Sequence, residues 1–288
     1  MTVPGILFFL LFSYVPLYGL VIAFQNFDYM KGIAGSKFIG FRNFQFLFNS
    51  PDVLRATFNT VWLNVLWIVT GTIVSVAIAL MLSEVGSKAF VKVTQTVVIF
   101  PHFLSWTIIA LFLLAFLNPD TGLINELLKL FGGRSVDFYS KSQYWTGILV
   151  IMKLWQNAGF SSIIYTATIA GISQDIYEAA DIDGATRLQK IVFITLPMLK
   201  STIILLTLFA VGRIFNGDFG MIYALVRDNS LLFPTTDVID TYVFRAMRTL
   251  GDYGMSTAAG LYQSVVGFVL VVIANALARR FDPDSAIY

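Results

Sequence analysis

Long apolar stretches alternate with short polar segments along almost the whole chain. A helix needs about 20 consecutive, mostly apolar residues to cross roughly 30 Å of hydrocarbon, and six stretches reach that length. They cover residues 2–24, 57–83, 93–119, 144–172, 201–226 and 253–278. The charged residues inside them are Lys153, Arg213 and Asp218. This pattern predicts an all-α integral membrane protein with six transmembrane helices, in which residues 1–288 form a single transmembrane domain.

The segments between the predicted spans carry shorter helical signals. Ahead of the second span, four apolar side chains share one helical face, which suits a helix lying in the membrane interface. These side chains are Phe41, Phe44, Leu47 and Phe48. Ser50 followed by Pro51 predicts the start of the next helix, and Pro101 predicts a kink in the third span. Short apolar helices are expected around residues 123–130 and 238–250.

The composition supports a membrane protein and removes several kinds of chemistry. Hydrophobic residues make up 57% of the chain and charged residues 12%, whereas a typical soluble domain carries about 25% charged residues. The sequence contains no cysteine, which excludes disulfides and thiolate chemistry. His102 is the only histidine, and we expect it to pack within the fold without a catalytic role. The net charge of +2 is spread along the chain and provides no basic block for nucleic acid.

The first apolar stretch stands where a signal peptide would stand. It lacks a basic start and a small-residue cleavage site, and it is longer than the apolar run of about 7–15 residues that signal peptides carry. We therefore interpret it as a retained helix. Because this helix starts almost at Met1, a native cytoplasmic leader is expected ahead of it.

The loop between the fourth and fifth predicted spans is unusually polar for this chain. Asp175 with Glu178, and Thr186 with Gln189, have the spacing of capping boxes and predict two short helices. Gly184 lies between them, where a left-handed residue would end the first helix. Two amphipathic helices that only cover the end of the bundle would carry the same signals.

The spacing within this loop is more specific than its capping signals. Glu-Ala-Ala at positions 178–180 is followed by Gly184 and, after nine further residues, by Ile194-x-Leu196-Pro197. This pattern resembles the signature loop of the permease subunits of binding-protein-dependent ABC importers.

The resemblance covers nearly the whole chain. Three longer stretches are similar to the carbohydrate-importer permeases, in particular to the branch that handles complex oligosaccharides and polysaccharide fragments. They read VPLYGLVIAFQNFDYMKGIAGSKFIGFRNFQFLF, LWQNAGFSSIIYTATIAGISQDIYEAADIDGAT and DVIDTYVFRAMRTLGDYGMSTAAGLYQSV.

The resemblance implies that residues 173–198 form a coupling loop. In the family this loop is cytoplasmic, and its first helix, the coupling helix, docks in a cleft of the ATPase subunit. The residues to which this role carries over are Glu178, Ala179, Ala180, Asp181, Asp183 and Gly184. Glu178 would pair with a basic group of the ATPase, and the two small alanines would permit close approach of the partner. The two aspartates would assist the docking or only keep the loop soluble.

The resemblance also implies partners and a location. The chain would assemble with a second homologous permease, two ATP-binding cassette subunits and an extracytoplasmic solute-binding protein in a bacterial cell membrane. The complex would import oligosaccharides or polysaccharide fragments. ATP and magnesium would be bound by the partner ATPase subunits, and this chain would hold no cofactor and no metal. Its sequence contains no G-x-x-x-x-G-K-[ST] phosphate loop.

The orientation implied by the family disagrees with a simple charge count. With the coupling loop in the cytoplasm, both termini would be cytoplasmic. The loops on that side hold seven lysines and arginines against ten on the opposite side, and a positive-inside rule would place the termini outside. We expect the orientation that the resemblance implies.

Polar residues inside the spans predict the route of the substrate, because they are costly in lipid. Aromatic rings beside amides suit a sugar, since the ring covers C–H faces while the amides bond hydroxyl groups. The predicted pathway residues are Trp155, Gln156, Asn157, Asn216, Tyr262 and Gln263. Hydrogen bonding between helices is the alternative role for each of them. Arg213 and Asp218 are expected to neutralise each other or a group on a neighbouring helix.

Two other classes of protein make different demands on the sequence. The alternative function is that of a secondary transporter or of a permease for another polar solute. A secondary transporter should contain inverted repeats and discontinuous helices at the midplane, and the sequence shows neither clearly. A membrane enzyme should present a cluster of histidines or acids within a span, whereas Asp218 stands alone. The sequence therefore favours a transport subunit that is not itself an enzyme, and copurification with an ATPase would separate these classes.

Overall fold

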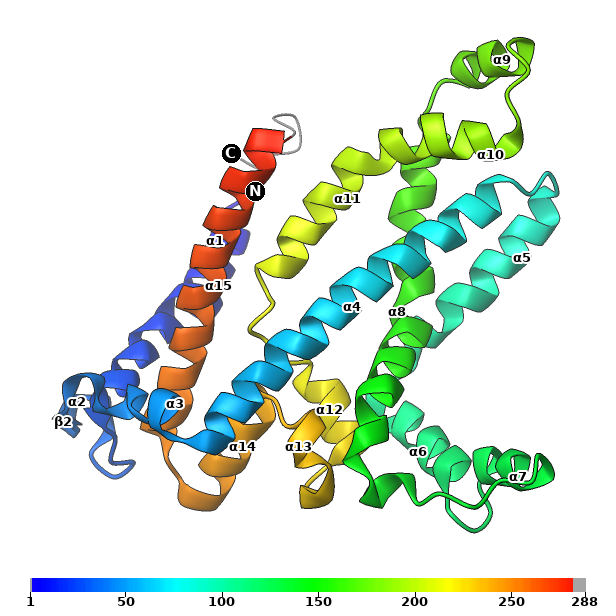
Figure 1. Ribbon diagram of the computed structural model, residues 1–288. Helices are drawn as coiled ribbons and strands as arrows, with labels where there is room; N and C mark the ends of the chain where they lie inside the picture. The colour runs from blue at the N-terminus through cyan, green and yellow to red at the C-terminus, as the bar shows by residue number, and fades with distance from the viewer. Residues whose placement is uncertain (1, 282–288) are drawn as a thin grey trace.

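The computed structural model describes residues 2–281, which form an almost entirely helical fold (Figure 1). Within these residues, five helices are long and apolar enough to cross a membrane, and a sixth segment qualifies if one sharply bent helix pair is counted as a single span. The segments are Val3–Phe24, Pro51–Ser83, Lys88–Phe103 with Trp106–Leu117, Ser142–Ala170, Arg187–Val211 and Tyr253–Ala276. The predicted fold class, an all-α membrane protein, is confirmed.

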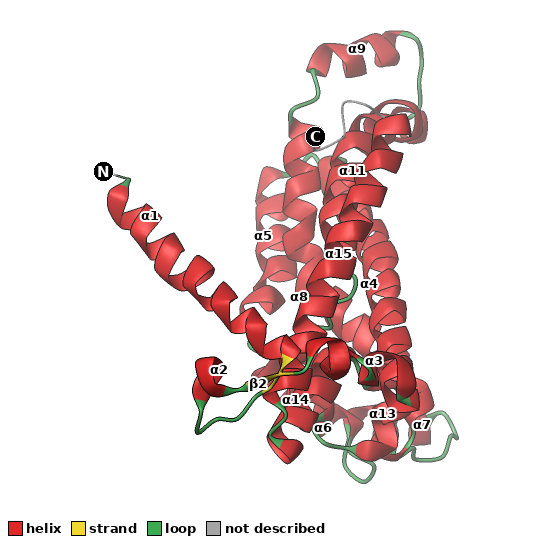
Figure 2. Ribbon diagram, turned by 90° about the vertical axis from the view of Figure 1, so that its left-hand side faces the viewer, coloured by secondary structure: helices red, strands yellow, loops and turns green. Residues whose placement is uncertain are grey.

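The first segment runs away from the other helices (Figure 2). It consists of α1 (Val3–Phe9), the π-helix η1 (Leu10–Tyr14) and the 3-10 helix η2 (Val15–Phe24). Ala23 is the only fully buried residue that the structure describes in this segment. A long apolar helix with so little packing needs lipid or another protein around it.

A small connector joins the first segment to the second span. Its elements are β1 (Gln25–Asn26), α2 (Gly32–Gly35), β2 (Lys37–Phe38), η3 (Gly40–Phe44) and α3 (Phe46–Asn49). The two strands pair antiparallel, with Gln25 opposite Phe38. The predicted interfacial helix is thus divided between η3 and α3, and its apolar face is not uniform, because Leu47 is buried whereas Phe41 and Phe48 are exposed.

Helices α4 (Pro51–Ser83) and α8 (Trp145–Ala170) pack against each other along their length and carry much of the core. Helix α4 begins at Pro51, as predicted, although Ser50 makes no side-chain capping bond. One buried cluster joins these helices to α6 (Trp106–Leu117) and α12 (Phe219–Val226). It includes Leu63, Trp67, Ile109, Leu149, Met221 and Ile222. A second cluster joins them to α11 (Leu196–Val211) and contains Val76, Ala79, Tyr165 and Leu199.

The third span is sharply bent. Helix α5 (Lys88–Ile99) continues into the 3-10 helix η4 (Phe100–Phe103), and α6 (Trp106–Leu117) then leaves at an angle of 97°. Pro101 lies at the start of η4, as the predicted kink requires, and Ser105 caps the new helix with its side chain. The sequence therefore located this bend, although its size is larger than a simple proline kink.

His102 and the elements after α6 complete the first half of the fold. The imidazole ring of His102 stacks on Phe160 with ring centroids 4.1 Å apart, a packing contact. The elements that connect α6 to α8 are α7 (Leu123–Leu130), η5 (Phe138–Ser140) and η6 (Ser142–Tyr144).

The fifth span is interrupted, whereas the sequence predicted one continuous helix over residues 201–226. Its elements are α10 (Arg187–Lys190), the π-helix η7 (Ile191–Thr195), α11 (Leu196–Val211) and α12 (Phe219–Val226). Residues 212–218, between α11 and α12, are not helical. The remaining elements are α9 (Gln174–Ile182), η8 (Ser230–Leu232), α13 (Phe233–Thr236), α14 (Ile239–Leu250) and α15 (Tyr253–Phe281).

Different elements lie at the two ends of the helix bundle. The start of α1, the end of α15 and the short helix α9 lie towards one end (Figure 1). The connector helices α2 and α3, together with α7, α13 and α14, lie towards the other end (Figures 1 and 2).

Gly159 lets α8 approach α5 closely. A Cβ atom at this position would collide with the backbone carbonyl of Val98. We expect Gly159→Ala to push the two helices apart and to lower the stability of the purified protein by about 1–3 kcal/mol, the usual cost of overpacking. Thermal unfolding in detergent measures this loss. Gly147→Ala is the matched control on the same helix, because no atom lies within 4 Å of its Cβ position, and it should not lower the unfolding temperature.

Candidate functional site

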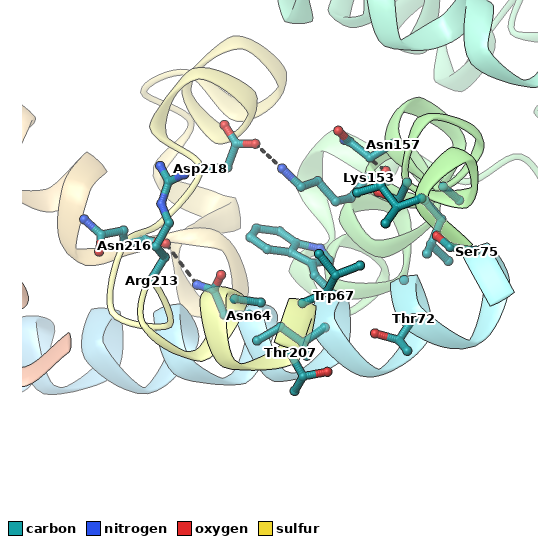
Figure 3. A pocket seen from close by; sticks show the side chains of 18 of the residues that line it. Asn64, Trp67, Thr72, Ser75, Lys153, Asn157, Thr207, Arg213, Asn216 and Asp218 are labelled. Carbon is teal, nitrogen blue, oxygen red and sulfur yellow. Dashed lines mark hydrogen bonds and ion pairs between the residues drawn. The ribbon is translucent and has the colours of Figure 1, made fainter. Parts of the chain in front are cut away.

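A polar cavity lies between α4, α8, α11 and the unwound segment 212–218 (Figure 3). Its volume is about 650 Å³, which falls within the range of about 300–1,000 Å³ that ligand pockets occupy. Polar side chains contribute much of its wall: Asn64, Thr72, Ser75, Lys153, Asn157, Ser161, Thr207, Arg213, Asn216 and Asp218. Because such groups are costly within a membrane span, their convergence indicates a route or binding site for a polar solute.

An ion pair crosses this cavity between two spans. Lys153 Nζ of α8 lies 2.5 Å from Asp218 Oδ2, at the end of the unwound segment. The same ammonium group lies 5.4 Å from the ring centroid of Trp67 and 5.8 Å from that of Trp106. The carboxylate and the two indole faces together stabilise a cation that would otherwise be expensive in this environment.

The unwound segment is held by defined hydrogen bonds. Asp218 caps α12 by accepting a 3.0 Å hydrogen bond from the Met221 N–H. Asp240 of α14 accepts a 2.6 Å bond from the Gly217 N–H. Gln263 of α15 donates to the Phe215 carbonyl at 2.7 Å and to Asp240 at 3.1 Å. The break between α11 and α12 is therefore stabilised by specific contacts. Side chains make hydrogen bonds to backbone groups that would be bonded within the helix if it continued.

Burial raises the pKa of the Asp240 carboxyl above its ordinary value. The hydrogen bonds from Gly217 and Gln263 act in the opposite direction, since they favour the charged form. Asp240 is thus a partly buried acid that accepts hydrogen bonds from Gly217 and Gln263, and these bonds hold the unwound segment against α14 and α15.

The structure brings two of the six predicted pathway residues to the cavity. Asn157 and Asn216 line it, and the Asn216 carbonyl accepts a 3.1 Å hydrogen bond from the Asn64 amide.

The other four predicted pathway residues do not line the cavity, which corrects the expected convergence. Gln156 is buried and donates to the Leu104 carbonyl, while Trp155 is 45% exposed on another face of α8. Consecutive helical residues point about 100° apart, so Trp155, Gln156 and Asn157 cannot share one face. On α15, Gln263 holds the unwound segment, and Tyr262 packs edge-on against aromatic rings.

Several functional candidates were not predicted as pathway residues. Lys153, Trp67 and Asn64 line the cavity from α8 and α4. A lone lysine within an apolar span was the available signal for Lys153, whereas nothing local distinguishes Trp67 from an ordinary core residue. Asp218 neutralises a charged group on a neighbouring helix, namely Lys153 of α8. In the part of the chain that the structure describes, it makes no ion pair with Arg213.

Helix α9 and its turn form a second, separate site. The helix has no buried residue, and Glu178 and Ala179 are exposed on it. Its N-cap is Ser173, whose side chain accepts from the Asp175 N–H, so the predicted capping role of Asp175 is wrong. Both residue types cap helices well, but Ser173 directly precedes the helix, whereas Asp175 lies within its first turn.

The end of α9 follows the prediction closely. Gly184 adopts a left-handed conformation with φ of +77°. The Gly184 N–H bonds the Asp181 carbonyl at 3.1 Å, and the Ala185 N–H bonds the Ala180 carbonyl at 2.9 Å. This pair of bonds is a Schellman motif, which ends a helix and reverses the chain. The capping box of Thr186 with Gln189 is also present and opens α10.

Two contacts attach α9 to the bundle. The Tyr177 hydroxyl lies 2.9 Å from the Thr195 hydroxyl, and Lys190 Nζ lies 2.7 Å from Asp181 Oδ1. These contacts use one side of the helix, while Glu178, Ala179 and Ile182 remain exposed. With Ile182 88% exposed, the free side presents an apolar patch beside an acid, which is the kind of surface that another protein covers.

The comparison with protein families decides the class of the chain. The model of the family described as "Binding-protein-dependent transport system inner membrane component" matches residues 68–283. The chain belongs to this family. The match includes the cavity residues from Ile68 onwards and the whole of α9.

Other members of the family resemble the chain over nearly its full length. The "Polygalacturonan/rhamnogalacturonan transport system permease protein YteP" of Bacillus subtilis (strain 168) is 38% identical over 99% of this chain and 88% of its own. "Protein LplB" of the same organism is 36% identical, with coverage of 99% and 89%. Among solved structures, a chain of "a bacterial ABC transporter involved in the import of the acidic polysaccharide alginate" is 38% identical, with a TM-score of 0.88 and coverage of 97% and 93%.

A second solved structure adds an assembly. It is described as a "bacterial alginate ABC transporter in complex with alginate pentasaccharide-bound periplasmic protein", and the matching chain is 37% identical, with a TM-score of 0.88 and coverage of 97% and 92%. As a member of the binding-protein-dependent transport family, this chain is a membrane component of a transporter.

Proposed function

We propose that this chain is the permease subunit of an ATP-driven importer that moves oligosaccharides or polysaccharide fragments into a bacterial cell. The observation that carries the proposal is the full-length similarity, at a TM-score of 0.88 and 38% identity, to a permease of an alginate importer. The relative named for polygalacturonan and rhamnogalacturonan transport supports the same class of substrate.

The cavity supports a sugar as the solute. Asn64, Asn157 and Asn216 line it, and the amide oxygens of Asn64 and Asn157 can accept hydrogen bonds from hydroxyl groups while their N–H groups donate within the fold. We propose that the sugar passes along this wall. Asn157 and Asn216 remain pathway residues in this proposal, whereas Gln156 and Gln263 act as structural supports for the wall. Trp155 and Tyr262 are left without a proposed contact to the sugar.

The exposed side of α9 is proposed to dock on a partner ATPase in the cytoplasm. Glu178 would meet a basic group there, and the small side chains of Ala179 and Ala180 would permit close approach. Gly184 would hold the turn that sets the angle of the helix. Asp181 is engaged by Lys190, so its role is to fix α9 on the bundle, and Asp183 would contribute charge at the rim.

The remaining partners follow from the surface of the chain and from its relatives. The complex with a periplasmic protein in a similar structure supports a solute-binding protein on the side opposite α9. The exposed apolar surface of α1, η1 and η2 suits lipid and a second permease. Because the start of α1 and the end of α15 lie towards the same end as α9 (Figure 1), both termini would be cytoplasmic.

Nucleotide binding tests this assignment. Purified alone, the chain is expected to bind no ATP, since its sequence has no phosphate loop. A tag on the chain should retain an ATPase and a second permease from solubilised membranes, and that complex should bind ATP with magnesium. Equilibrium binding of a fluorescent ATP analogue checks both samples. Stoichiometric nucleotide binding to the isolated chain would contradict the proposal, as would a complex that contains no ATPase.

A further inference from the structure

Arg213 presents a charge to the cavity that nothing in the described chain neutralises. It lies in the unwound segment between α11 and α12, and its side chain lines the cavity and is exposed there. Figure 3 shows it beside Asn216 and Asp218, with the only drawn ion pair running from Asp218 to Lys153. Within residues 2–281, its guanidinium group has no ion-pair or hydrogen-bond partner.

The charged residues of the cavity wall do not balance. The charged lining residues are Lys153, Arg213 and Asp218. Because Lys153 and Asp218 pair at 2.5 Å, one positive charge remains. Because this charge faces a solute cavity and has no anionic partner in the described chain, it favours an anion there.

The chemistry of the guanidinium group indicates which kind of anion Arg213 would bind. A guanidinium group offers a planar fork of N–H donors that matches a carboxylate in a bidentate manner. The same wall offers the amide oxygens of Asn64 and Asn157 to hydroxyl groups of a solute. A solute that satisfies both the guanidinium group and these amide oxygens carries hydroxyl groups and a carboxylate.

We propose that Arg213 binds the carboxylate of a uronic acid unit as the saccharide passes, so that the imported oligosaccharides are acidic. This inference rests on the proposed function as a saccharide permease and adds the charge of the substrate to it. A neutral sugar would leave the guanidinium group desolvated and unpaired, which selects against it at this point of the route.

Paired acid and ester sugars test the inference. The ligands are the trisaccharides of galacturonate, mannuronate and glucuronate. Each is compared with its methyl ester, in which the carboxylate is replaced by a neutral ester group. Equilibrium binding is measured on the complete permease–ATPase complex in nanodiscs without binding protein, so that the selectivity of the binding protein does not enter. The wild type should bind at least one acid about 10- to 100-fold more tightly than its ester, the range expected for a charge-assisted hydrogen bond.

Substitution of Arg213 identifies the group responsible. Arg213→Gln should remove the preference for the acid while leaving ester binding unchanged, and Arg213→Lys should keep part of the preference because it keeps the charge. Equal binding of acid and ester by the wild type overturns the inference. So does an equal loss of both ligands in Arg213→Gln, the result expected if Arg213 instead pairs with an acid of the second permease.

Uptake separates this inference from the proposed function. If the wild type shows no preference for acids but the complete importer takes up a neutral probe, maltotriose, in an ATP-dependent manner, the substrate charge is wrong and the permease assignment stands. If neither maltotriose nor any of the uronate trisaccharides is taken up, both proposals fail.

Discussion

Reversing the charge of Glu178 is expected to abolish sugar uptake while leaving the chain inserted in the membrane. Glu178 is exposed on α9, and the contacts that attach this helix to the bundle come from Tyr177 and Asp181. Glu178→Lys should therefore leave the fold intact but place a like charge against the basic group proposed on the ATPase, which would cost several kcal/mol at a buried interface. Uptake should fall to the level of vesicles without importer, and the ATPase should dissociate more readily during purification.

Two controls separate coupling from folding in this experiment. Glu84→Lys reverses an exposed acid at the end of α4 and should retain uptake. Gly184→Pro should lose uptake, because proline cannot adopt the φ of +77° and removes the N–H that bonds Asp181. Gly184→Asn should retain most uptake, since asparagine tolerates the left-handed conformation. Normal uptake by both Glu178→Lys and Gly184→Pro would refute the coupling role of α9.

Removing the negative charge of Asp218 is expected to destabilise the cavity wall more than any other single change there. Asp218→Asn leaves Lys153 without an anion between the rings of Trp67 and Trp106. Breaking a fully buried ion pair costs about 3–5 kcal/mol. The side chains of Lys153 and Asp218 are 27% and 23% exposed, so we expect a smaller loss of about 1–3 kcal/mol.

The substitution isolates charge from helix capping. Asparagine caps helices about as well as aspartate, so the bond from the Met221 N–H to residue 218 is expected to persist. Adding Lys153→Met removes the stranded cation, and the double variant should recover stability relative to Asp218→Asn alone. Thermal unfolding of the purified complex, analysed as a double-mutant cycle, gives the coupling energy. A double variant no more stable than Asp218→Asn would show that the pair does not stabilise the wall.

The sequence predicted well what depends on local composition. Five of the six apolar spans, the start of α4 at Pro51 and the left-handed turn at Gly184 all follow from residue type and spacing, whereas the fifth span covers Arg187–Val211 and not 201–226. The capping box of Thr186 with Gln189 does so too. The N-cap of α9 was misplaced because Ser173 and Asp175 are both good capping residues two positions apart.

The sequence predicted less of what depends on contacts between distant segments. The interruption at residues 212–218 is stabilised by Asp240 and Gln263, which lie on later helices, and hydropathy alone does not reveal such support. Lys153 and Asp218 are 65 positions apart, so their pairing requires the fold. Their similar depth within the span also suggested one shared role for Gln156 and Asn157. In the fold Asn157 lines the cavity, whereas Gln156 is buried and donates to the Leu104 carbonyl.

ATP-dependent uptake by the complete importer tests the central claim most directly. Proteoliposomes would hold this chain, its second permease and the ATPase subunits, with the solute-binding protein outside carrying a radiolabelled oligosaccharide that it binds. The account predicts accumulation of the sugar only when ATP is supplied on the α9 side and every subunit is present, and no effect of ionophores that collapse proton or sodium gradients. Accumulation driven by such a gradient without ATP, or by this chain without the ATPase, would contradict it.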